Sequence, residues 1–182
     1  MKDSFQLILL AYFGIAFLPS CQSAPVAPPP PPVEFDAPDY FLLRPELEKS
    51  YGYSHAVRIG NNLIISGAVS MDDAGNLIGH GDMALQIKNC YADLKKILDH
   101  YGFEVEDVVV ENILTTNMEE FIKVSALRNE IYTQYFPTGS WIQVSGLALP
   151  GQLIEIEWEA LKSHWRPQHT FKPKKHSTNK TT

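Results

Sequence analysis

Three glutamates alternate with apolar residues near the end of the sequence's apolar-rich region. Glu155, Glu157 and Glu159 are separated by Ile156 and Trp158, so on a β-strand the three carboxylates share one face and the apolar side chains share the other. If Glu155 is buried near its neighbours, desolvation and carboxylate repulsion both raise its pKa. A carboxyl group of this kind suits general acid–base chemistry on water. The simpler interpretation of Glu157 and Glu159 is a solvated strand face.

Other residues of reactive type are spaced in ways that disfavour catalysis. Ser54 and His55 are adjacent, and neighbouring residues on a strand point to opposite faces, which argues against a Ser–His pair. Cys90 falls on the apolar stripe of an expected helix and is predicted to be a buried thiol. Two cysteines exclude multi-cysteine zinc motifs, and the C-terminal histidines are not spaced as neighbours on a helix. No metal site is therefore expected.

The elements that position these residues follow from hydrophobic periodicity and turn chemistry. Apolar runs bounded by turn residues predict five strands, two within 55–69 and the others at 108–115, 141–147 and 153–161. Helical spacing predicts two helices, one at 83–101 between Asp82 and Gly102, the other from the capping box Asn117–Glu120 to Pro137.

The order β-β-α-β-α-β-β predicts an α/β sandwich with a mixed sheet. Two helices can cover only one face of such a sheet, and the apolar positions on the second face need another cover. A neighbouring subunit is the economical cover, so the chain is predicted to form an oligomer.

Length and charge limit the function classes. The 182 residues allow one domain plus attachments, and 45% hydrophobic residues suit a globular core. The formal charge of −6 is unevenly distributed, because the six basic residues from 162 onward meet no acid there. Residues 1–161 keep nine basic and 21 acidic residues, a balance of −12. A body this acidic is not expected to bind nucleic acid in general.

The N-terminal region is predicted to be a targeting segment. Lys2 precedes a mostly apolar run from Phe5 to Leu18, which is shorter than the roughly 20 residues of a membrane-spanning helix. Residues 1–20 are thus predicted to be a lipoprotein-type signal peptide, since Leu18-Pro19-Ser20-Cys21 resembles the bacterial lipobox. The resemblance implies that Cys21 is lipidated and, with Gln22 after it, that the protein is anchored to the outer membrane facing the periplasm. The alternatives are a plain signal peptide or a short buried helix.

Three further segments complete the domain organisation. Residues 21–44 are predicted to be a Pro-rich tether, because proline favours a stiff polyproline II spacer. Residues 45–162 are the predicted folded domain. Residues 163–182 are a basic tail, interpreted as disordered or as a contact for anionic lipid or for the acidic body.

Several ordered pieces of the domain resemble the RidA (YjgF) family of imine deaminases. They are Gly52-Tyr53-Ser54-His55-Ala56-Val57, Ile65-Ser66-Gly67, Asn89 to Leu98, Asp107 to Thr116 and Leu153-Ile154-Glu155-Ile156-Glu157. The resemblance implies a chorismate-mutase-like fold and a homotrimer with small-molecule pockets at its subunit interfaces. It also implies hydrolysis of 2-imino or enamine acids to 2-oxo acids and ammonia, without metal or cofactor.

The family's site residues carry over in part. Tyr53 matches the tyrosine lining the pocket, Gly67 the glycine beside the ligand and Glu155 the carboxylate that activates water. For Tyr53 the alternative is simple packing against the sheet. Gly139 stands where the resemblance places the arginine that holds the substrate carboxylate, and Trp141 replaces a small or polar residue, adding apolar surface.

The missing arginine leaves two functions open. No Lys or Arg occurs between Arg128 and Lys162, and losing a charge-assisted bidentate contact costs on the order of 2–5 kcal/mol. Ordinary 2-imino acid hydrolysis is therefore not expected. The chain is either a divergent imine or enamine hydrolase for a neutral or apolar substrate, or a non-catalytic envelope lipoprotein that binds a small ligand beside Tyr53 and Trp141. An endoribonuclease, claimed for some relatives, conflicts with the acidic body.

Overall fold

The computed structural model describes residues 36–162. The predicted signal peptide, the lipidation site Cys21, the tether up to residue 35 and the basic tail lie outside the described residues. Within the described range, no helix combines the length and the apolar character needed to cross a bilayer.

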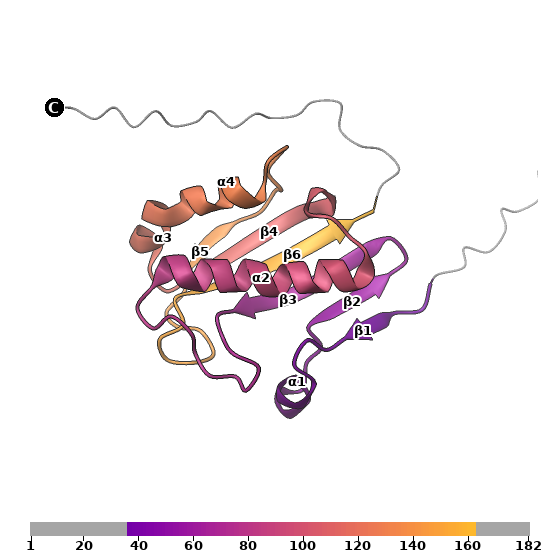
Figure 1. The fold of residues 1–182 in the computed structure, drawn as a ribbon, viewed down its shortest axis with the longest axis horizontal. Coiled ribbons are helices and arrows are strands. Elements are labelled where there is room, and N and C mark those ends of the chain that lie inside the picture. The colour runs from indigo at the N-terminus through magenta and orange to yellow at the C-terminus, as the bar shows by residue number, and fades with distance from the viewer. Residues whose placement is uncertain (1–35, 163–182) are drawn as a thin grey trace, which may run out of the picture. The chain divides into compact units, whose positions relative to one another are not determined.

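A mixed six-stranded sheet forms the centre of the domain, in the order β1-β2-β3-β6-β4-β5 (Figure 1). Its strands are β1 (Asp39–Phe41), β2 (Ala56–Ile59), β3 (Asn62–Val69), β4 (Val108–Thr115), β5 (Trp141–Gln143) and β6 (Ile154–Leu161). All neighbouring pairs are antiparallel except β4 and β5, which are parallel.

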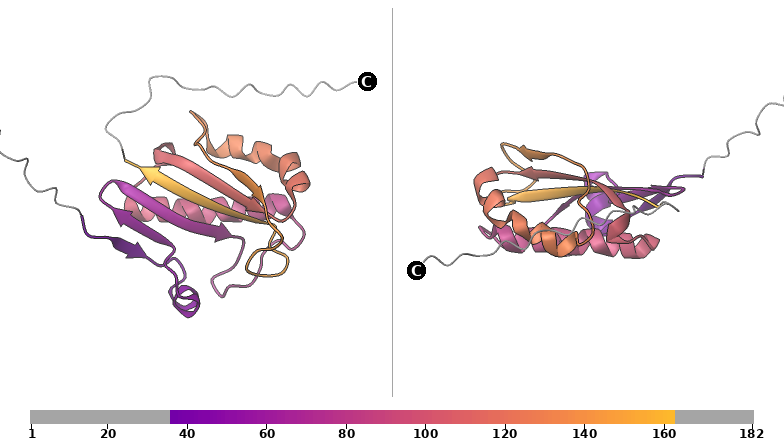
Figure 2. Two further views of the ribbon diagram at one scale, coloured as in Figure 1. Left: turned by 180° about the vertical axis from the view of Figure 1, so that it is seen from behind. Right: turned by 90° about the horizontal axis from the view of Figure 1, so that it is seen from above.

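The described part of the chain also contains four helices. They are α1 (Pro45–Tyr51), α2 (Met83–Tyr101), α3 (Met118–Val124) and α4 (Arg128–Ile131), with 3-10 turns η1 (Val105–Asp107) and η2 (Ser125–Leu127). Figures 1 and 2 show α2, α3 and α4 against one face, while no helix lies over the opposite face. The predicted architecture, an α/β sandwich with its main helices on one face, is confirmed.

The alternation in β6 builds the core between the sheet and α2. Ile154, Ile156, Trp158 and Ala160 are fully buried. Helix α2 begins where predicted, since Asp82 accepts a hydrogen bond from the Leu85 amide, and it ends at Gly102, whose φ of 67° is left-handed. Cys90 is buried as predicted, and burial raises the pKa of its thiol.

Two elements were not predicted. Strand β1 lies inside the expected tether 21–44 and pairs Phe41 with Ala56, so the fold begins before residue 45. Helix α1 has too few apolar residues for a periodic signal. It is held instead by the buried carboxylate of Glu48, which accepts hydrogen bonds from the Leu43 and Arg44 amides at 3.0 and 2.9 Å.

Two predicted elements are shorter than expected. The second helix is interrupted by η2 and ends at Ile131, and Tyr132, which follows it, is buried. Strand β5 ends at Gln143 instead of Leu147, because its partner β4 ends at Thr115 and leaves the following backbone without a strand to pair with. Val144 still donates one hydrogen bond to the Thr115 carbonyl, at 2.9 Å.

A buried carboxylate joins the broken helix to the core. Glu111, on the helix-covered face of β4, is only 1% exposed. Its carboxylate accepts hydrogen bonds from the Tyr91 hydroxyl (3.0 Å), the Tyr132 hydroxyl and the Trp158 indole nitrogen (3.2 Å). Arg128 completes the cluster, with its Nε 2.6 Å from Oε1. Four donors thus compensate the desolvation of this carboxylate.

We predict that Glu111→Ala lowers the free energy of unfolding by about 3–5 kcal/mol, because Arg128 and three neutral donors then lose their buried acceptor. Urea unfolding of Glu111→Ala, Arg128→Ala and the double variant measures this. The double variant should lose less than the sum of the single losses. A loss below about 1 kcal/mol for Glu111→Ala would contradict this role.

Candidate functional site

A cavity of about 350 Å³ lies where α1, β3 and β6 meet. It is lined by Leu47, Tyr51, Tyr53, Ser66, Gly67, Val69, Met71, Gly75, Ala148, Leu149 and Glu155. Tyr53, Gly67 and Glu155, three of the five residues predicted for ligand chemistry, are therefore brought together within one subunit.

Glu155 projects from β6 on the face without helices. Its strand partners are Val69 on β3 and Leu114 on β4. The side chain is half-buried among apolar residues, and burial, followed by the charge of Glu157, raises the pKa of its carboxyl group. Within residues 36–162, no hydrogen bond or ion pair reaches this carboxylate.

Gly67 makes room for that carboxylate. It lies in the irregular stretch of β3 where the register with β6 shifts, between Ile65 and Ala68. A Cβ at Gly67 would overlap the Oε1 and Cδ atoms of Glu155. The glycine is thus required for the close approach of the Glu155 side chain to the β3 backbone.

Tyr53 reaches the cavity because the chain turns sharply after α1. Gly52 adopts a left-handed φ of 76°, and the Tyr53 amide donates to the Glu48 carbonyl at 3.1 Å. The ring is 38% exposed, and burial, then the charge of Glu48, raises the pKa of its hydroxyl. Tyr53 therefore lines the cavity rather than only packing on the sheet.

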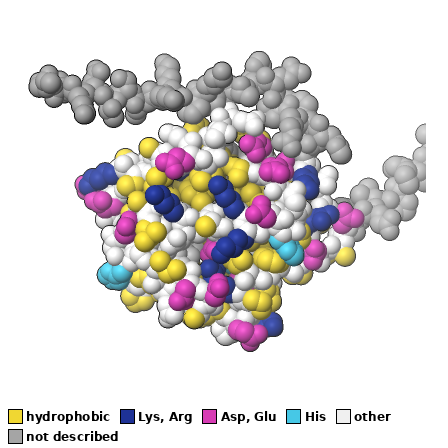
Figure 3. All heavy atoms as spheres, viewed as in Figure 1, with side chains coloured by type: hydrophobic (Ala, Val, Ile, Leu, Met, Phe, Trp, Pro, Cys, Tyr) yellow, Lys and Arg dark blue, Asp and Glu magenta, His cyan; other side chains and the backbone are white. Residues whose placement is uncertain are grey.

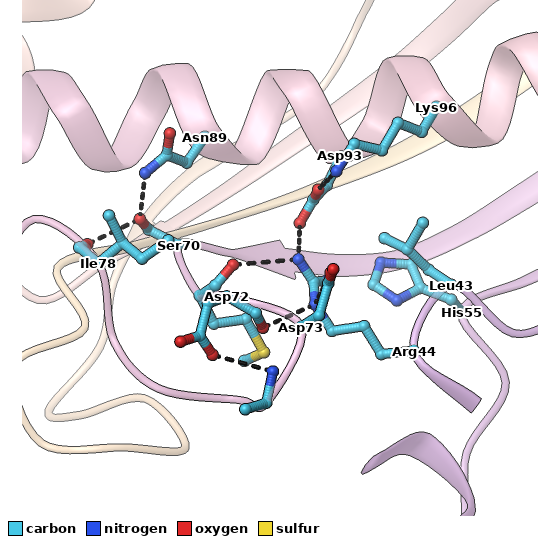
Figure 4. A network of polar contacts seen from close by, with 12 residues as sticks. Leu43, Arg44, His55, Ser70, Asp72, Asp73, Ile78, Asn89, Asp93 and Lys96 are labelled. Carbon is cyan, nitrogen blue, oxygen red and sulfur yellow. Dashed lines mark hydrogen bonds and ion pairs between the residues drawn. The ribbon is translucent and has the colours of Figure 1, made fainter. Parts of the chain in front are cut away.

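A buried polar network supports the wall behind Tyr53. Glu48 Oε1 lies 2.9 Å from His55 Nδ1, and burial lowers the pKa of His55. Arg44 pairs with Asp93 of α2 at 2.6 Å (Figure 4). Its guanidinium also donates to the Met71 and Asp72 carbonyls, both at 3.0 Å, and so fixes the loop that supplies Met71 to the cavity.

This network was not predicted from the sequence. Its partners are up to 49 residues apart, which no local pattern reveals. One signal was available: Pro45 at the start, with Glu46 and Glu48 in the first turn, is typical of a helix N-terminus and would have placed Glu48 on a helix of the folded domain.

Gly139 and Trp141 lie away from this cavity within the subunit. Trp141 pairs with Ile113, on the helix-covered side of the sheet, and its ring contacts Phe121 edge-on at 4.8 Å and the Arg128 guanidinium at 5.4 Å. Gly139 lies against β4, where a Cβ would overlap the Glu111 carbonyl. The expected contribution of these two residues to the pocket is not made by their own subunit.

No positive side chain lines the cavity among the described residues. Arg44 is buried and paired with Asp93, and Arg128 is paired with Glu111. In the same part of the chain, no group of three or more His, Cys, Asp or Glu residues is arranged to hold a metal ion. The described lining consists of one carboxylate without a protein partner, two tyrosines, Ser66, two glycines and apolar side chains.

Comparison with known proteins gives consistent matches. The model of the Endoribonuclease L-PSP family matches residues 44–162. A RutC family protein of Pyrococcus horikoshii is 33% identical over 114 residues, which cover 60% of this chain and 86% of the relative. The human 2-iminobutanoate/2-iminopropanoate deaminase is 34% identical over 115 residues, covering 60% and 80%.

Solved structures agree with the sequence matches. The crystal structure of Rv2704 from Mycobacterium tuberculosis, described as a member of the YjgF/YER057c/UK114 family, superposes with a TM-score of 0.61 at 27% identity. The match covers 69% of this chain and all of that one. It confirms the α/β fold expected from the resemblance.

We predict that Gly67→Ala displaces the Glu155 carboxylate and removes ligand binding or turnover at the cavity, while the domain still folds. The overlapping atoms belong to the end of a flexible side chain, which can move aside. Thermal unfolding and a crystal structure of the variant test this. Gly146→Ala is the matched control, since a Cβ there meets nothing within 4 Å. An unmoved Glu155 in the variant would refute the packing argument.

Proposed function

Because the chain belongs to the Endoribonuclease L-PSP family, the RidA (YjgF) family of the resemblance described above, we propose that its cavity hydrolyses an imine or the corresponding enamine. The observation that carries the proposal is Glu155, an unpaired and half-buried carboxylate of raised pKa facing an apolar cavity. The names of relatives such as the human deaminase support the reaction class.

The proposed reaction uses one acid–base group. Glu155 accepts a proton from water as the oxygen attacks the imine carbon, and the resulting carboxyl group returns the proton to the nitrogen. The tetrahedral intermediate then releases ammonia and leaves the carbonyl product, so that R₂C=NH and H₂O give R₂C=O and NH₃. The raised pKa of Glu155 favours both halves of this cycle, because the carboxyl group binds and releases a proton closer to neutral pH.

The substrate is proposed to differ from the ordinary 2-imino acids. A substrate carboxylate would find no Lys or Arg in the wall formed by the described residues. Gly139, where the resemblance places arginine, packs so closely on Glu111 that a larger residue requires a shift of the backbone. The arginine has therefore not simply been lost from an otherwise unchanged loop.

We also propose a homotrimer, in which the uncovered face of the sheet meets other copies. Several apolar side chains are exposed on that face. They include Ile59 (40%), Ile64 (45%), Ile142 (48%) and Leu161 (41%). Such an apolar surface favours burial by association. The number three comes from the family resemblance, and a neighbouring copy would be the source of any Gly139 or Trp141 contact with the cavity.

The envelope location stays a proposal. Lipidation of Cys21 and anchoring to the outer membrane facing the periplasm rest on the lipobox-like segment, which lies outside the described residues. A diacylglyceryl adduct on Cys21 in the mass spectrum of the purified full chain is the expected result, and an unmodified thiol would refute it.

We predict that Glu155→Gln lowers imine hydrolysis by about 10²-fold or more, because the base for water is lost. Glu159→Gln is the control, since this exposed carboxylate lies on the same strand face but does not line the cavity. Because the folded state raises the pKa of Glu155, stability is lost as the pH rises from the ordinary glutamate pKa through the raised pKa of the folded state. Glu155→Gln should therefore melt no lower than wild type at neutral pH, and any gain should disappear at acidic pH. Full activity in Glu155→Gln would end the proposal.

Glu157→Gln should move the acid limb of the pH–rate profile to lower pH, since the charge of Glu157 helps to raise the pKa of Glu155. The profile is measured with one substrate for both proteins. An unchanged acid limb would show that another group controls the rate.

Light scattering at micromolar concentration should report three chains per particle. An Ile64→Glu or Ile142→Glu variant should dissociate, because each places a charge on the exposed apolar face. Ile122→Glu is the control, since Ile122 is equally exposed but belongs to α3 on the helix-covered side. A wild-type monomer would refute the assembly.

A further inference from the structure

Among the described lining residues, the cavity carries only negative charge. Glu155 is the only Asp, Glu, Lys, Arg or His among the described lining residues. Its carboxylate has no protein partner within residues 36–162, although burial disfavours its ionised form. Glu157 continues the same strand face, and its charge acts on Glu155. A ligand with a positive nitrogen would supply the missing partner, whereas a ligand carboxylate would be repelled.

The rest of the wall fits an apolar substituent. Leu47 and Tyr51 come from one face of α1, four residues apart, and Val69, Met71 and Leu149 add aliphatic surface. Tyr51 and Tyr53 provide aromatic rings, and aromatic faces attract ammonium or iminium groups. A carboxylate beside aromatic rings in an apolar cavity is suited to an alkyl or aryl cation.

The lysines of α2 and α3 lie away from the cavity. Figure 3 shows Lys and Arg side chains on the helix-covered face, where Lys88 and Lys95 border a groove between α2 and α4. Lys96 pairs with Asp93, and Lys123 pairs with glutamates of its own helix. These positive side chains therefore belong to the opposite side of the sheet from Glu155.

A second copy on the uncovered face would bring little positive charge from its strands. By strand alternation, the residues that share this face with Glu155 are apolar, Ser, Asn or Glu in β3, β4, β5 and β6. The segment with Gly139 and Trp141 also lacks Lys and Arg. These strands and this segment of a second copy would therefore add no Lys or Arg to the cavity.

From these observations we infer that the cavity selects imines derived from primary amines that carry an apolar substituent and no carboxylate, and binds them as iminium ions. This inference rests on the proposed function and names its substrate class. Glu155 pairs with the positive nitrogen and accepts the proton of the attacking water. The overall reaction converts R–CH=NH₂⁺ and H₂O into R–CHO and NH₄⁺, with no oxidant or reductant.

The test compares two imines with the same phenyl group on the full chain. One is formed from 2-phenylethylamine by an amine oxidase, and the other from L-phenylalanine by an L-amino-acid oxidase. Semicarbazide competes with the protein for each imine, so faster hydrolysis is measured as a slower formation of semicarbazone. We expect kcat/KM to be at least about 10-fold higher for the amine-derived imine, since a buried charge mismatch is worth that factor or more. An equal or higher value for the imino acid would overturn the inference while leaving the hydrolase proposal intact.

If neither imine is turned over, the hydrolase proposal fails and the substrate assignment fails with it, and binding then tests the charge selection of the cavity separately. Calorimetry then compares 2-phenylethylammonium with 3-phenylpropanoate, which have the same ring and opposite charges. At least about 10-fold tighter binding of the ammonium ion supports the charge selection. Equal affinities, tighter binding of the propanoate or no binding of either ligand would overturn it.

Two variants test whether Glu155 is the group that selects the positive ligand. Glu155→Gln should bring the affinity ratio of the two ligands close to one, and Glu159→Gln should leave it unchanged. A ratio that survives Glu155→Gln would show that another group recognises the charge.

Discussion

The two-sided alternation of β6 is the constraint on which the rest of the structure depends. One side of this strand buries Ile154, Ile156 and Trp158, and the other presents Glu155 and Glu157. The buried side requires the cover of α2 and of the segment from α3 to α4. Since those helices cover one face only, the carboxylates remain on the face that no helix covers. A one-residue shift in the register of β6 would exchange the two sides and destroy both the core and the site.

Burial of the Glu155 carboxylate disfavours the folded state when this group is ionised, and other interactions compensate for this cost. Glu155 is half-buried without a partner from the described residues, which disfavours its charged form. Elsewhere the buried charges are paired: Glu111 receives four donors, and Arg44 is neutralised by Asp93. This contrast separates the paired charges that hold the fold together from a carboxylate to which no described residue is paired.

Local patterns predicted the parts of the fold that depend on neighbours in sequence. The period of two in β6, the Asp82 cap and Gly102 predicted elements that the structure contains. The family resemblance pointed to Tyr53, Gly67 and Glu155, and the structure places all three around one cavity. The Glu111 cluster could not be predicted, because its partners come from α2, α4, β6 and the loop after α4, and meet only in three dimensions. For the same reason the sequence could not place Trp141, whose ring is turned toward Phe121 by the register of β5 with β4.

The state of the Glu155 carboxyl group is the most direct test of the whole account. Carbon-13 NMR can follow its side-chain carbon through a pH titration, first alone and then with saturating 2-phenylethylammonium, using Glu155→Gln to assign the signal. We predict that the pKa of Glu155 lies above the ordinary glutamate value in the free protein. It should decrease when the ammonium ion binds, because a positive partner favours the ionised form. An ordinary pKa that does not respond to the ammonium ion would contradict the claim that Glu155 is an unpaired, ligand-facing carboxylate.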